Sequence, residues 1–306
     1  MRRRKLGARG SEISVIGYGA WEAGGAAWGP NESEEVVVDA IRTGIDAGID
    51  WIDTAEVYGD GVSEMLVGRA ISGRRDDVVL ASKVAPQPEG SGFEPAQVRQ
   101  ACEKSLGRLG TDRIDLYQLH WPDTSGTPLE ETWGAMIELQ DAGLVRSIGV
   151  SNFDREQIER CLAIRHVDSL QPEFSMLVRD HAELIRWCGE QGIGVITYGP
   201  LAFGLLSGAI TVDTQFPPGD WRGEKQGDGP FADLARSLEV VDRIRPVAER
   251  IGCSLSQLAL AWNVHQPGVT AAIAGSRNPS HVRANAAAGD IELDQTTLAE
   301  LDALLA

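Results

Sequence analysis

Short apolar runs alternate with longer stretches of helical spacing from residue 13 almost to the end of the chain. Runs such as Val78–Ser82 and Ile114–Leu119 are rich in β-branched and other apolar residues, as strands are. Glu34–Ala47 and Pro95–Leu109 instead repeat apolar positions every three or four residues, which favours helices. Repetition of this strand and helix pair predicts a parallel sheet covered by helices.

Eight such pairs can be counted, and eight pairs in 306 residues favour a closed (β/α)8 TIM barrel over an open sheet. The predicted strands are Val15–Gly19, Trp51–Asp53, Val78–Ser82, Ile114–Leu119, Ser147–Val150, Ser169–Gln171, Val195–Tyr198 and Thr270–Ala274. The predicted helices are Glu34–Ala47, Ser63–Ile71, Pro95–Leu109, Leu129–Ala142, Arg155–Ile164, His181–Gln191, Leu255–His265 and His281–Ala287.

Other segments lie outside this repeat. The turn-rich Arg3–Ser14 predicts an N-terminal β-hairpin, and Gln295–Leu305 predicts a short helix at the tail. Leu201–Asp233 is a long segment rich in glycine and proline, and Phe231–Ile251 reads as an extra helix inserted before the last strand and helix pair. Long loops in compact domains are usually functional. We expect residues 1–306 to form a single barrel domain.

The charge balance argues against two classes of partner. With 28 basic and 45 acidic residues the net charge is −17, which opposes attraction to nucleic acid or to anionic lipid. No apolar stretch is long enough to span a membrane, and the basic start of the chain is not followed by the apolar segment of an export signal. The four cysteines are widely spaced without a C-x-x-C pair, so we expect reduced packing residues, a cytoplasmic location and no metal site.

Four residues that can perform acid–base chemistry stand at or just beyond the ends of predicted strands. They are Asp53, Tyr58, Lys83 and His120. Taken singly, such residues more often cap a turn, face solvent or serve structure. In a parallel barrel, however, the carboxyl ends of the strands converge on one mouth, so these four should meet there. A carboxylate, a phenol, an ammonium and an imidazole in one pocket make a site that donates protons.

Reduction of a carbonyl by hydride needs a proton for the developing alkoxide, and Tyr58 can supply it. An unperturbed phenol has a pKa near 10, so we expect the charge of Lys83 to lower the pKa of Tyr58. Asp53 would keep Lys83 protonated in the barrel. His120 can donate a hydrogen bond that orients the carbonyl oxygen.

The ordered set D-T-A-x-x-Y-G at 53–59, S-K at 82–83 and H-W-P at 120–122 resembles the aldo-keto reductase superfamily, over nearly all of residues 4–290. The motifs are most similar to bacterial general stress type aldo/keto reductases. The resemblance implies an enzyme that reduces aldehydes or ketones to alcohols with NADPH, giving NADP+. It also implies Tyr58 as general acid, Lys83 and Asp53 as the pair that tunes it, and His120 as the group that orients the substrate.

A cofactor site must be built without a Rossmann fingerprint, because the chain has no G-x-G-x-x-G. The resemblance implies that Ser151, Asn152 and Gln171 hold the nicotinamide carboxamide while Tyr198 stacks on the ring. The glycine-rich segment that contains Gly199, Leu201 and Gly204 can present backbone N–H groups to a pyrophosphate.

A second anion site is predicted after the last strand, where Gly275-Ser276-Arg277 opens a helix. A helix N-terminus together with a guanidinium suits a phosphate monoester, and the resemblance implies the 2′-phosphate of NADPH. For the adenine, Asn285 matches the family pattern, whereas His281 stands where the family usually has Gln or Glu.

The tryptophans divide into two groups. Trp21, Trp28, Trp121 and Trp221 follow predicted strands or lie in the long loop, so they should face the mouth and contact a small carbonyl substrate. Trp51, Trp133, Trp187 and Trp262 fall in strand or helix patterns and are expected in the core. Both a hydrophobic carbonyl compound and a sugar suit an aromatic rim.

Two other functions stay open from sequence alone. Channel-associated β subunits keep this barrel, its four acid–base residues and a bound nucleotide, so a redox-sensing regulatory subunit is an alternative. A phosphate-handling barrel isomerase that uses Lys83 and His120 is a weaker one. Monomeric and homo-oligomeric states fit equally well.

Overall fold

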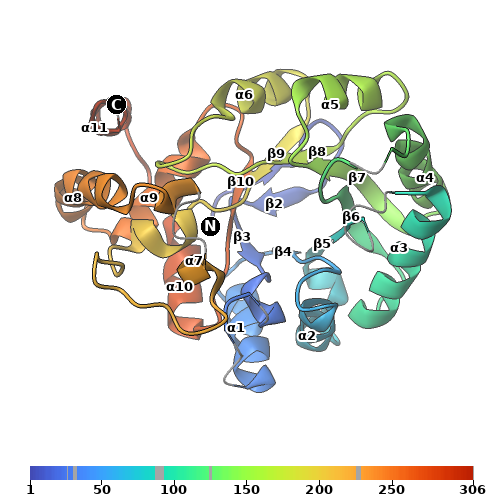
Figure 1. Cartoon of the computed structure of the whole chain (residues 1–306), viewed down its shortest axis with the longest axis horizontal. Coiled ribbons are helices and arrows are strands. Elements are labelled where there is room, and N and C mark those ends of the chain that lie inside the picture. The colour runs from blue at the N-terminus through green and yellow to red at the C-terminus, as the bar shows by residue number, and fades with distance from the viewer. Residues whose placement is uncertain (26, 30–32, 87–92, 124–125, 225–228, 306) are drawn as a thin grey trace.

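The computed structural model contains a closed barrel of parallel strands in the order β10-β3-β4-β5-β6-β7-β8-β9, which confirms the predicted (β/α)8 TIM barrel (Figure 1). It describes residues 1–25, 27–29, 33–86, 93–123, 126–224 and 229–305. The strands are β1 (Arg3–Lys5), β2 (Glu12–Ser14), β3 (Ile16–Gly19), β4 (Trp51–Asp53), β5 (Val79–Val84), β6 (Ile114–Leu119), β7 (Val145–Ser151), β8 (Ser169–Gln171), β9 (Gly194–Thr197) and β10 (Ala271–Ala274).

Helices surround the barrel and cover the outer face of its strands (Figure 1). They are α1 (Glu34–Asp46), α2 (Val62–Ile71), α3 (Pro95–Leu109), α4 (Leu129–Asp141), α5 (Arg155–Leu162), α6 (Ala182–Glu190), α7 (Trp221–Glu224), α8 (Leu234–Ile251), α9 (Leu255–His265), α10 (Pro279–Ala288) and α11 (Gln295–Leu304). Among the residues described, no helix combines the length and apolar character needed to cross a lipid bilayer.

Local sequence signals explain where helices begin and end. Helix α3 starts with Pro95, and Glu94 forms a capping box with Gln97 that satisfies backbone N–H groups of the first turn. It stops at Gly110, whose φ of 63° lies in the left-handed region that glycine adopts without strain. Helices α5 and α9 begin with capping boxes of the same kind. These caps fix the helix boundaries and therefore the lengths of the loops at the mouth.

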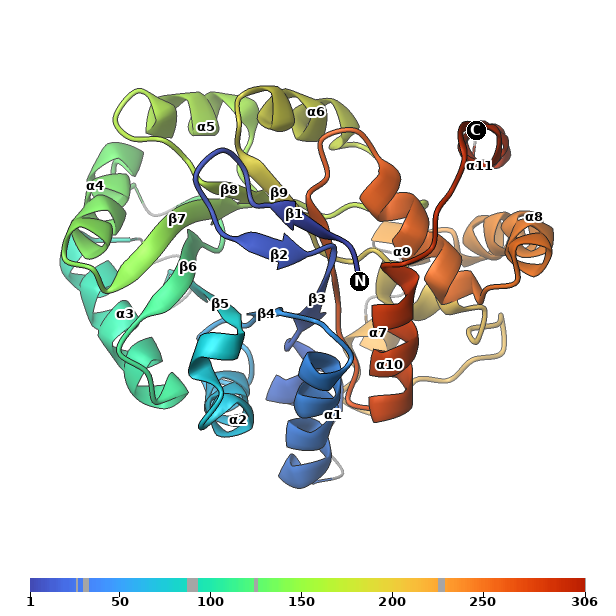
Figure 2. The same ribbon diagram turned by 180° about the vertical axis from the view of Figure 1, so that it is seen from behind.

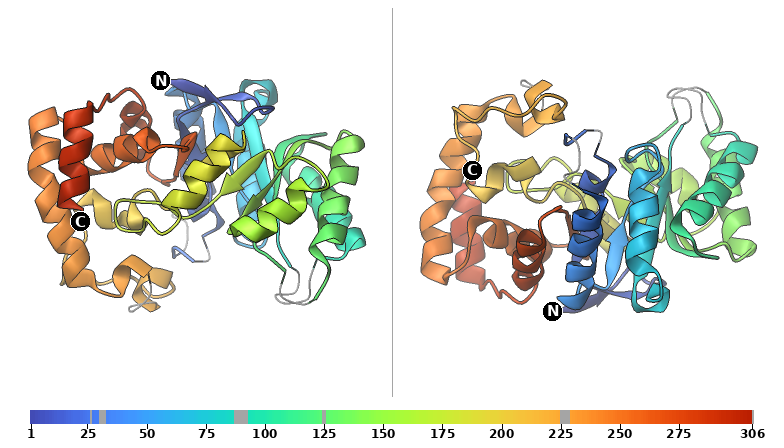
Figure 3. Two further views of the ribbon diagram at one scale, coloured as in Figure 1. Left: turned by 90° about the horizontal axis from the view of Figure 1, so that it is seen from above. Right: turned by 90° about the horizontal axis from the view of Figure 1, so that it is seen from below.

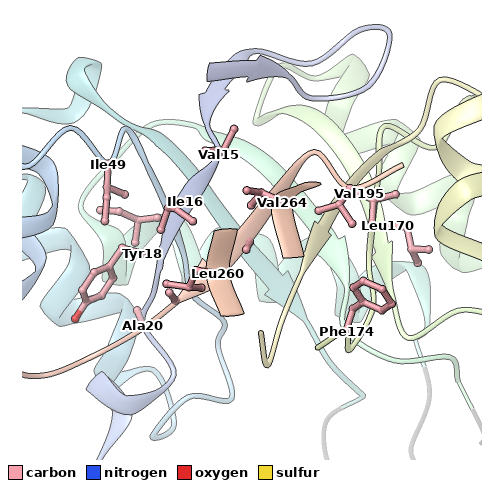
Figure 4. Packing of buried hydrophobic residues seen from close by; sticks show 14 of the residues in the cluster. Val15, Ile16, Tyr18, Ala20, Ile49, Leu170, Phe174, Val195, Leu260 and Val264 are labelled. Atoms are coloured by element: carbon pink, nitrogen blue, oxygen red, sulfur yellow. The ribbon is translucent and has the colours of Figure 1, made fainter. Parts of the chain in front are cut away.

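The core has two parts. A large cluster lies between the strands and the helices, where Ile16 and Tyr18 of β3 and Leu260 of α9 are buried (Figure 4). A smaller cluster fills the inside of the barrel with Trp51, Leu116 and other residues from alternate strand positions. Because side chains fill the barrel interior, the space for chemistry is at the mouth.

The predicted N-terminal hairpin is present and lies across the end of the barrel opposite the mouth (Figure 2). Strands β1 and β2 pair antiparallel, with Arg3 opposite Ser14. Leu6 and Ile13, which are 3% and 1% exposed, pack into the cluster inside the barrel. The hairpin therefore plugs the amino-terminal end of the strands.

The long segment after β9 is more structured than the predicted loop. It contains a 3-10 turn at Ala202–Ser207, helix α7 and a second 3-10 turn at Gly229–Phe231, while residues 225–228 lie outside the described part of the chain. The backbone N–H of Trp221 donates to the carbonyl of Ala27 at 2.9 Å. The segment thus contacts the loop that follows β3, and it leads into α8, which lies beside α11 (Figure 3).

Several predicted boundaries were wrong by a few residues. Strand β5 continues to Val84, which places Lys83 within the strand, and β9 ends at Thr197, one residue before Tyr198. The inserted helix α8 begins at Leu234 rather than Phe231, because Asp233 accepts a hydrogen bond from the Arg236 N–H and caps it there. Helix α10 begins two residues earlier than expected.

We expect Gly17→Ala to destabilise the barrel, because a Cβ at this position would lie 2.1 Å from Cε2 of the buried Trp51 ring. Overpacking of this kind typically costs about 1–3 kcal/mol. Gly107→Ala in α3 is the matched control, since nothing lies within 4 Å of its added Cβ. Alanine should stabilise that helix by roughly 0.5–1 kcal/mol. Chemical unfolding of both variants checks this, and equal shifts in the same direction would contradict it.

Candidate active site

A buried ion pair lies at the mouth between β4 and β5. Nζ of Lys83 is 2.6 Å from Oδ2 of Asp53, and the two side chains are 0% and 4% exposed. The same Nζ donates to the Thr54 carbonyl at 3.0 Å and lies 3.1 Å from the hydroxyl of Tyr58. All three N–H groups of the ammonium therefore have a hydrogen-bond partner. Of these three partner residues, Asp53 and Thr54 are buried and Tyr58 is partly exposed at the mouth.

His120 lies beside this group, just after β6. Its ring centroid is 5.6 Å from that of Tyr58 in an edge-to-face arrangement, and its face stacks on Trp121 at 3.8 Å. Among the described residues, Nδ1 of His120 has no hydrogen-bond partner. The ring is thus oriented by packing, and it is 6% exposed. The structure brings together all four residues that the sequence placed at the strand ends.

Burial controls the protonation of these groups. Desolvation and the charge of Lys83 hold the pKa of His120 well below its usual 6.5, so the imidazole is neutral. Burial and the charge of Asp53 raise the pKa of Tyr58 well above 10. The lowering of this pKa that was expected from Lys83 is wrong for the free protein, in which burial also lowers the pKa of Lys83 itself. Tyr58 therefore keeps its proton at neutral pH.

The residues expected around the nicotinamide form one hydrogen-bonded network. Nε2 of Gln171 donates to Oδ1 of Asp53 at 2.9 Å, and the Ser151 hydroxyl donates to the Gln171 carbonyl at 2.9 Å. Nδ2 of Asn152 donates to the His120 carbonyl at 3.1 Å, and the Tyr198 hydroxyl donates to Oδ1 of Asn152 at 2.9 Å. The amide groups are therefore held in place by the same network that holds Asp53.

The segment after Tyr198 turns sharply beside the mouth. Gly199, Ala202, Phe203 and Gly204 all have positive φ, with values of 66°, 46°, 55° and 102°. Such conformations are costly for Ala202 and Phe203, and strain of this kind gathers at ligand sites. Arg222 donates to the Phe203 carbonyl at 3.2 Å. Leu201 ends up partly buried against the core next to this turn.

The predicted phosphate site lies at the start of α10. Gly275 is required there, because a Cβ would lie 2.3 Å from the Gly19 carbonyl oxygen. The Arg277 guanidinium donates to the carbonyls of Gly29 and Trp28, both at 3.0 Å, and so it joins α10 to the loop after β3. Nδ1 of His281 is 3.5 Å from the hydroxyl of Ser276, while Asn285 is 4% exposed.

Three of the four tryptophans expected at the mouth form a cluster there. Trp21 stacks on Trp221 with ring centroids 5.7 Å apart, meets Trp28 edge-on at 5.1 Å and lies 6.2 Å from Tyr58. Trp121 is separate and 42% exposed. Of the expected core tryptophans, Trp187 is only partly buried, and its ring faces the Arg155 guanidinium at 4.7 Å.

Two charged residues at the mouth, Glu22 and Arg222, were not predicted from the sequence. Glu22 follows Trp21 in the 3-10 turn Glu22–Gly24, and burial raises the pKa of its carboxyl group. Arg222 follows Trp221, forms an ion pair with Asp220 at 2.6 Å and stacks on Trp28 at 4.7 Å. A charged residue next to a tryptophan in a loop beyond a strand was the available signal for both.

A nicotinamide nucleotide fits these residues. Amide groups of Asn152 and Gln171 lie beside the acid–base group, and the positive-φ turn permits close backbone approach further along the mouth. The start of α10 adds the positive end of a helix dipole and a guanidinium. Within the ranges that the structure describes, no cluster of three or more His, Cys, Asp or Glu side chains could hold a metal ion.

A closed parallel barrel with a buried Lys–Asp pair against a tyrosine at its mouth is an arrangement that can hold and move a proton. The chain belongs to the Aldo/keto reductase family, whose model matches residues 15–306. It is therefore an oxidoreductase that uses a nicotinamide cofactor on a small carbonyl compound.

Curated relatives and solved structures agree with this assignment. The chain is 38% identical over 284 residues to Aldo-keto reductase YhdN of Bacillus subtilis, covering 90% of this chain and 85% of the relative. It is 33% identical to the NADH-specific methylglyoxal reductase of Escherichia coli, covering 98% of each. An aldo/keto reductase from Klebsiella pneumoniae in complex with NADP and acetate is 36% identical, with a TM-score of 0.76 over 98% of this chain and 95% of that one.

A solved structure of the glycerol dehydrogenase AKR11B4 from Gluconobacter oxydans is 31% identical to the chain. It superimposes with a TM-score of 0.85 and covers 96% of this chain and 92% of that one. These relatives bear names with different substrates and cofactors, so membership of the family does not by itself select either.

We expect Lys83→Met to destabilise the protein by about 3–5 kcal/mol, because it leaves the buried carboxylate of Asp53 without its countercharge. Asp53→Asn should also be costly, since it leaves the ammonium unpaired. The double variant should recover part of the loss, because no buried charge remains unpaired. Denaturant unfolding of the four proteins measures the coupling. Strictly additive losses would contradict a coupled pair.

Proposed function

We propose that this protein reduces aldehydes or ketones to alcohols with NADPH, and that Tyr58 is the general acid. The observation that carries the proposal is the hydroxyl of Tyr58, a partly buried residue at the mouth, which lies 3.1 Å from Nζ of Lys83. A bound reduced nicotinamide supplies the hydride. The chain's own residues supply the proton and the orientation.

The proton follows a short path. The carbonyl carbon gains the hydride, and the O–H bond of Tyr58 breaks as its proton passes to the carbonyl oxygen, which becomes the alcohol oxygen. The ammonium of Lys83 stabilises the phenolate that remains and can return a proton to it, while Asp53 stabilises the lysine. Neutral His120 donates an N–H hydrogen bond to the same carbonyl oxygen and favours the developing charge.

The nucleotide is proposed to bind along the mouth. Ser151, Asn152 and Gln171 would hold the carboxamide, Tyr198 would stack on the ring, and Arg277 would bind the 2′-phosphate with Ser276. Support comes from the two Klebsiella pneumoniae structures, one in complex with NADP and one with NADPH. The NADH-specific relative from Escherichia coli shows that the cofactor differs among similar proteins, so it must be measured.

Tyr58→Phe should lose reduction of a good aldehyde by roughly 10²–10⁴-fold, the usual contribution of general acid catalysis, and retain nucleotide binding. Aldehyde-dependent loss of NADPH absorbance measures the first, and fluorescence quenching measures the second. Tyr117→Phe is the matched control, because this phenol is buried under the helices, away from the mouth.

Near wild-type turnover by Tyr58→Phe would remove the assignment of the general acid. A wild-type protein that holds nucleotide tightly but turns over none of a panel of aldehydes, ketones and sugars would instead indicate the regulatory subunit considered from the sequence.

Arg277→Ala should weaken binding of NADPH by about one to two decades and leave NADH nearly unchanged. Charge-assisted hydrogen bonds are worth roughly 1.5–3 kcal/mol, and only NADPH has the 2′-phosphate that accepts them. Added salt should reduce the difference between the cofactors. Because Arg277 also bonds to Gly29 and Trp28, thermal unfolding is measured alongside. Equal weakening of both nucleotides would assign Arg277 to the loop contacts alone.

A further inference from the structure

A strained turn directly follows the proposed proton donor. Successive positive φ values of 62°, 54° and 86° occur at Gly59, Asp60 and Gly61. Such a conformation is costly for Asp60, and it persists only where the surrounding structure holds it in place. The turn joins Tyr58 to the start of α2, and the backbone N–H of Ser63 donates to the Tyr58 carbonyl at 3.1 Å. The position of the phenol therefore depends on the contacts that hold this turn.

One arginine packs directly on the turn. A Cβ added at Gly61 would lie 2.4 Å from Cδ and 2.7 Å from Nε of Arg108, which belongs to α3. The Nε of Arg108 donates to Oε2 of Glu64 at 2.6 Å, and its Nη2 lies 3.9 Å from Oε2 of Glu56. Glu56 precedes Tyr58, whereas Glu64 follows the turn in α2. Arg108 thus contacts the segment on both sides of the phenol.

Glu64 connects this arginine to the barrel. Its side chain is 0% exposed, and its Oε1 accepts a hydrogen bond from the Ser82 hydroxyl at 2.6 Å. A buried carboxylate is tolerated only when it is paired and hydrogen-bonded, and each oxygen of Glu64 has such a donor. Ser82 precedes Lys83 in β5, and successive side chains of a strand point to opposite faces. Glu64 is therefore attached to the helix side of the strand that carries Lys83 on its other side.

We propose that Glu64 is a positioning residue for proton transfer, which holds the strained turn through Arg108 and the strand β5 through Ser82. These two attachments keep the hydroxyl of Tyr58 at its distance of 3.1 Å from Nζ of Lys83. Glu64 is fully buried, so it acts through these residues and not on the substrate. The inference rests on the proposed function, because it takes Tyr58 as the proton donor.

The same strand provides a matched pair away from the mouth. Asp115 in β6 forms an ion pair with Arg75 at 2.7 Å, and its side chain is 3% exposed. Its Oδ2 also accepts from the backbone N–H of Leu80, near the amino end of β5. Both acids are buried, paired with an arginine and bonded to β5. A purely structural role for Glu64 predicts that the loss of either carboxylate has the same effect.

The test compares Glu64→Gln and Ser82→Ala with Asp115→Asn in the full chain. Glutamine keeps the shape of Glu64, and alanine at position 82 removes only the hydroxyl, so it serves as the milder variant if Glu64→Gln folds poorly. The rate of NADPH oxidation by an aldehyde is measured in a single turnover, because nucleotide release often limits kcat. Aldehyde KM, NADPH affinity by fluorescence quenching and thermal unfolding are measured alongside.

We expect Glu64→Gln and Ser82→Ala to lower the single-turnover rate by roughly 10- to 100-fold, the effect of a small misplacement of reacting groups. Aldehyde KM and NADPH affinity should stay near wild type. Asp115→Asn should lower the temperature of unfolding and keep the rate. Wild-type rates in both variants, or an equal loss of rate in Asp115→Asn, would overturn the positioning role.

A second measurement asks whether the effect passes through the phenol. In a Tyr58→Phe background, Ser82→Ala should cause no further loss of the residual rate, since no phenol remains to be positioned. A loss as large as in the presence of Tyr58 would overturn the inference. A wild-type protein that binds NADPH and reduces no aldehyde would instead overturn the proposed function on which the inference rests.

Discussion

The buried ion pair between Lys83 and Asp53 is the interaction on which the rest of the mouth depends. Two charges that are 0% and 4% exposed are stable only with complete hydrogen bonding, and here the Thr54 carbonyl, the Tyr58 hydroxyl and the Gln171 amide provide it. Each of these partners is thereby fixed in position. The hydrogen bonds that offset the desolvation of Lys83 and Asp53 are therefore the same ones that fix the side chains of the site.

The barrel makes this arrangement possible by joining neighbouring strands in register. Asp53 pairs with Ala81 across β4 and β5, which brings the ends of the two strands to the same level. From the Asp53 carboxylate, hydrogen bonds continue through Gln171 to Ser151 and Asn152. The acid–base residues and the amides proposed to hold the nicotinamide therefore belong to one rigid network, so hydride and proton can arrive at the same carbonyl in a fixed geometry.

The sequence predicted the parts of this protein that depend on local pattern. Hydrophobic periodicity located the barrel strands and the main helices, and strand ends located Asp53, Lys83 and His120, because in a parallel barrel those ends share one mouth. It failed where contacts are long-range. Nothing in the local sequence shows that burial and the charge of Asp53 raise the pKa of Tyr58, or that Arg277 bonds to Gly29 and Trp28. Those facts depend on how close the loop after β3 comes to α10.

That close approach also explains how a chain with a net charge of −17 can accept an anionic nucleotide. Long-range attraction is absent, so binding must come from a few groups at short range. Arg277 lies just before α10 and Arg222 lies in α7, and Trp28 contacts both, through its carbonyl and its ring respectively. Trp21, in the same loop, lies 6.2 Å from Tyr58. One loop therefore contacts both arginines and the proton donor, and changes made for nucleotide preference in that loop act directly beside the site of reduction.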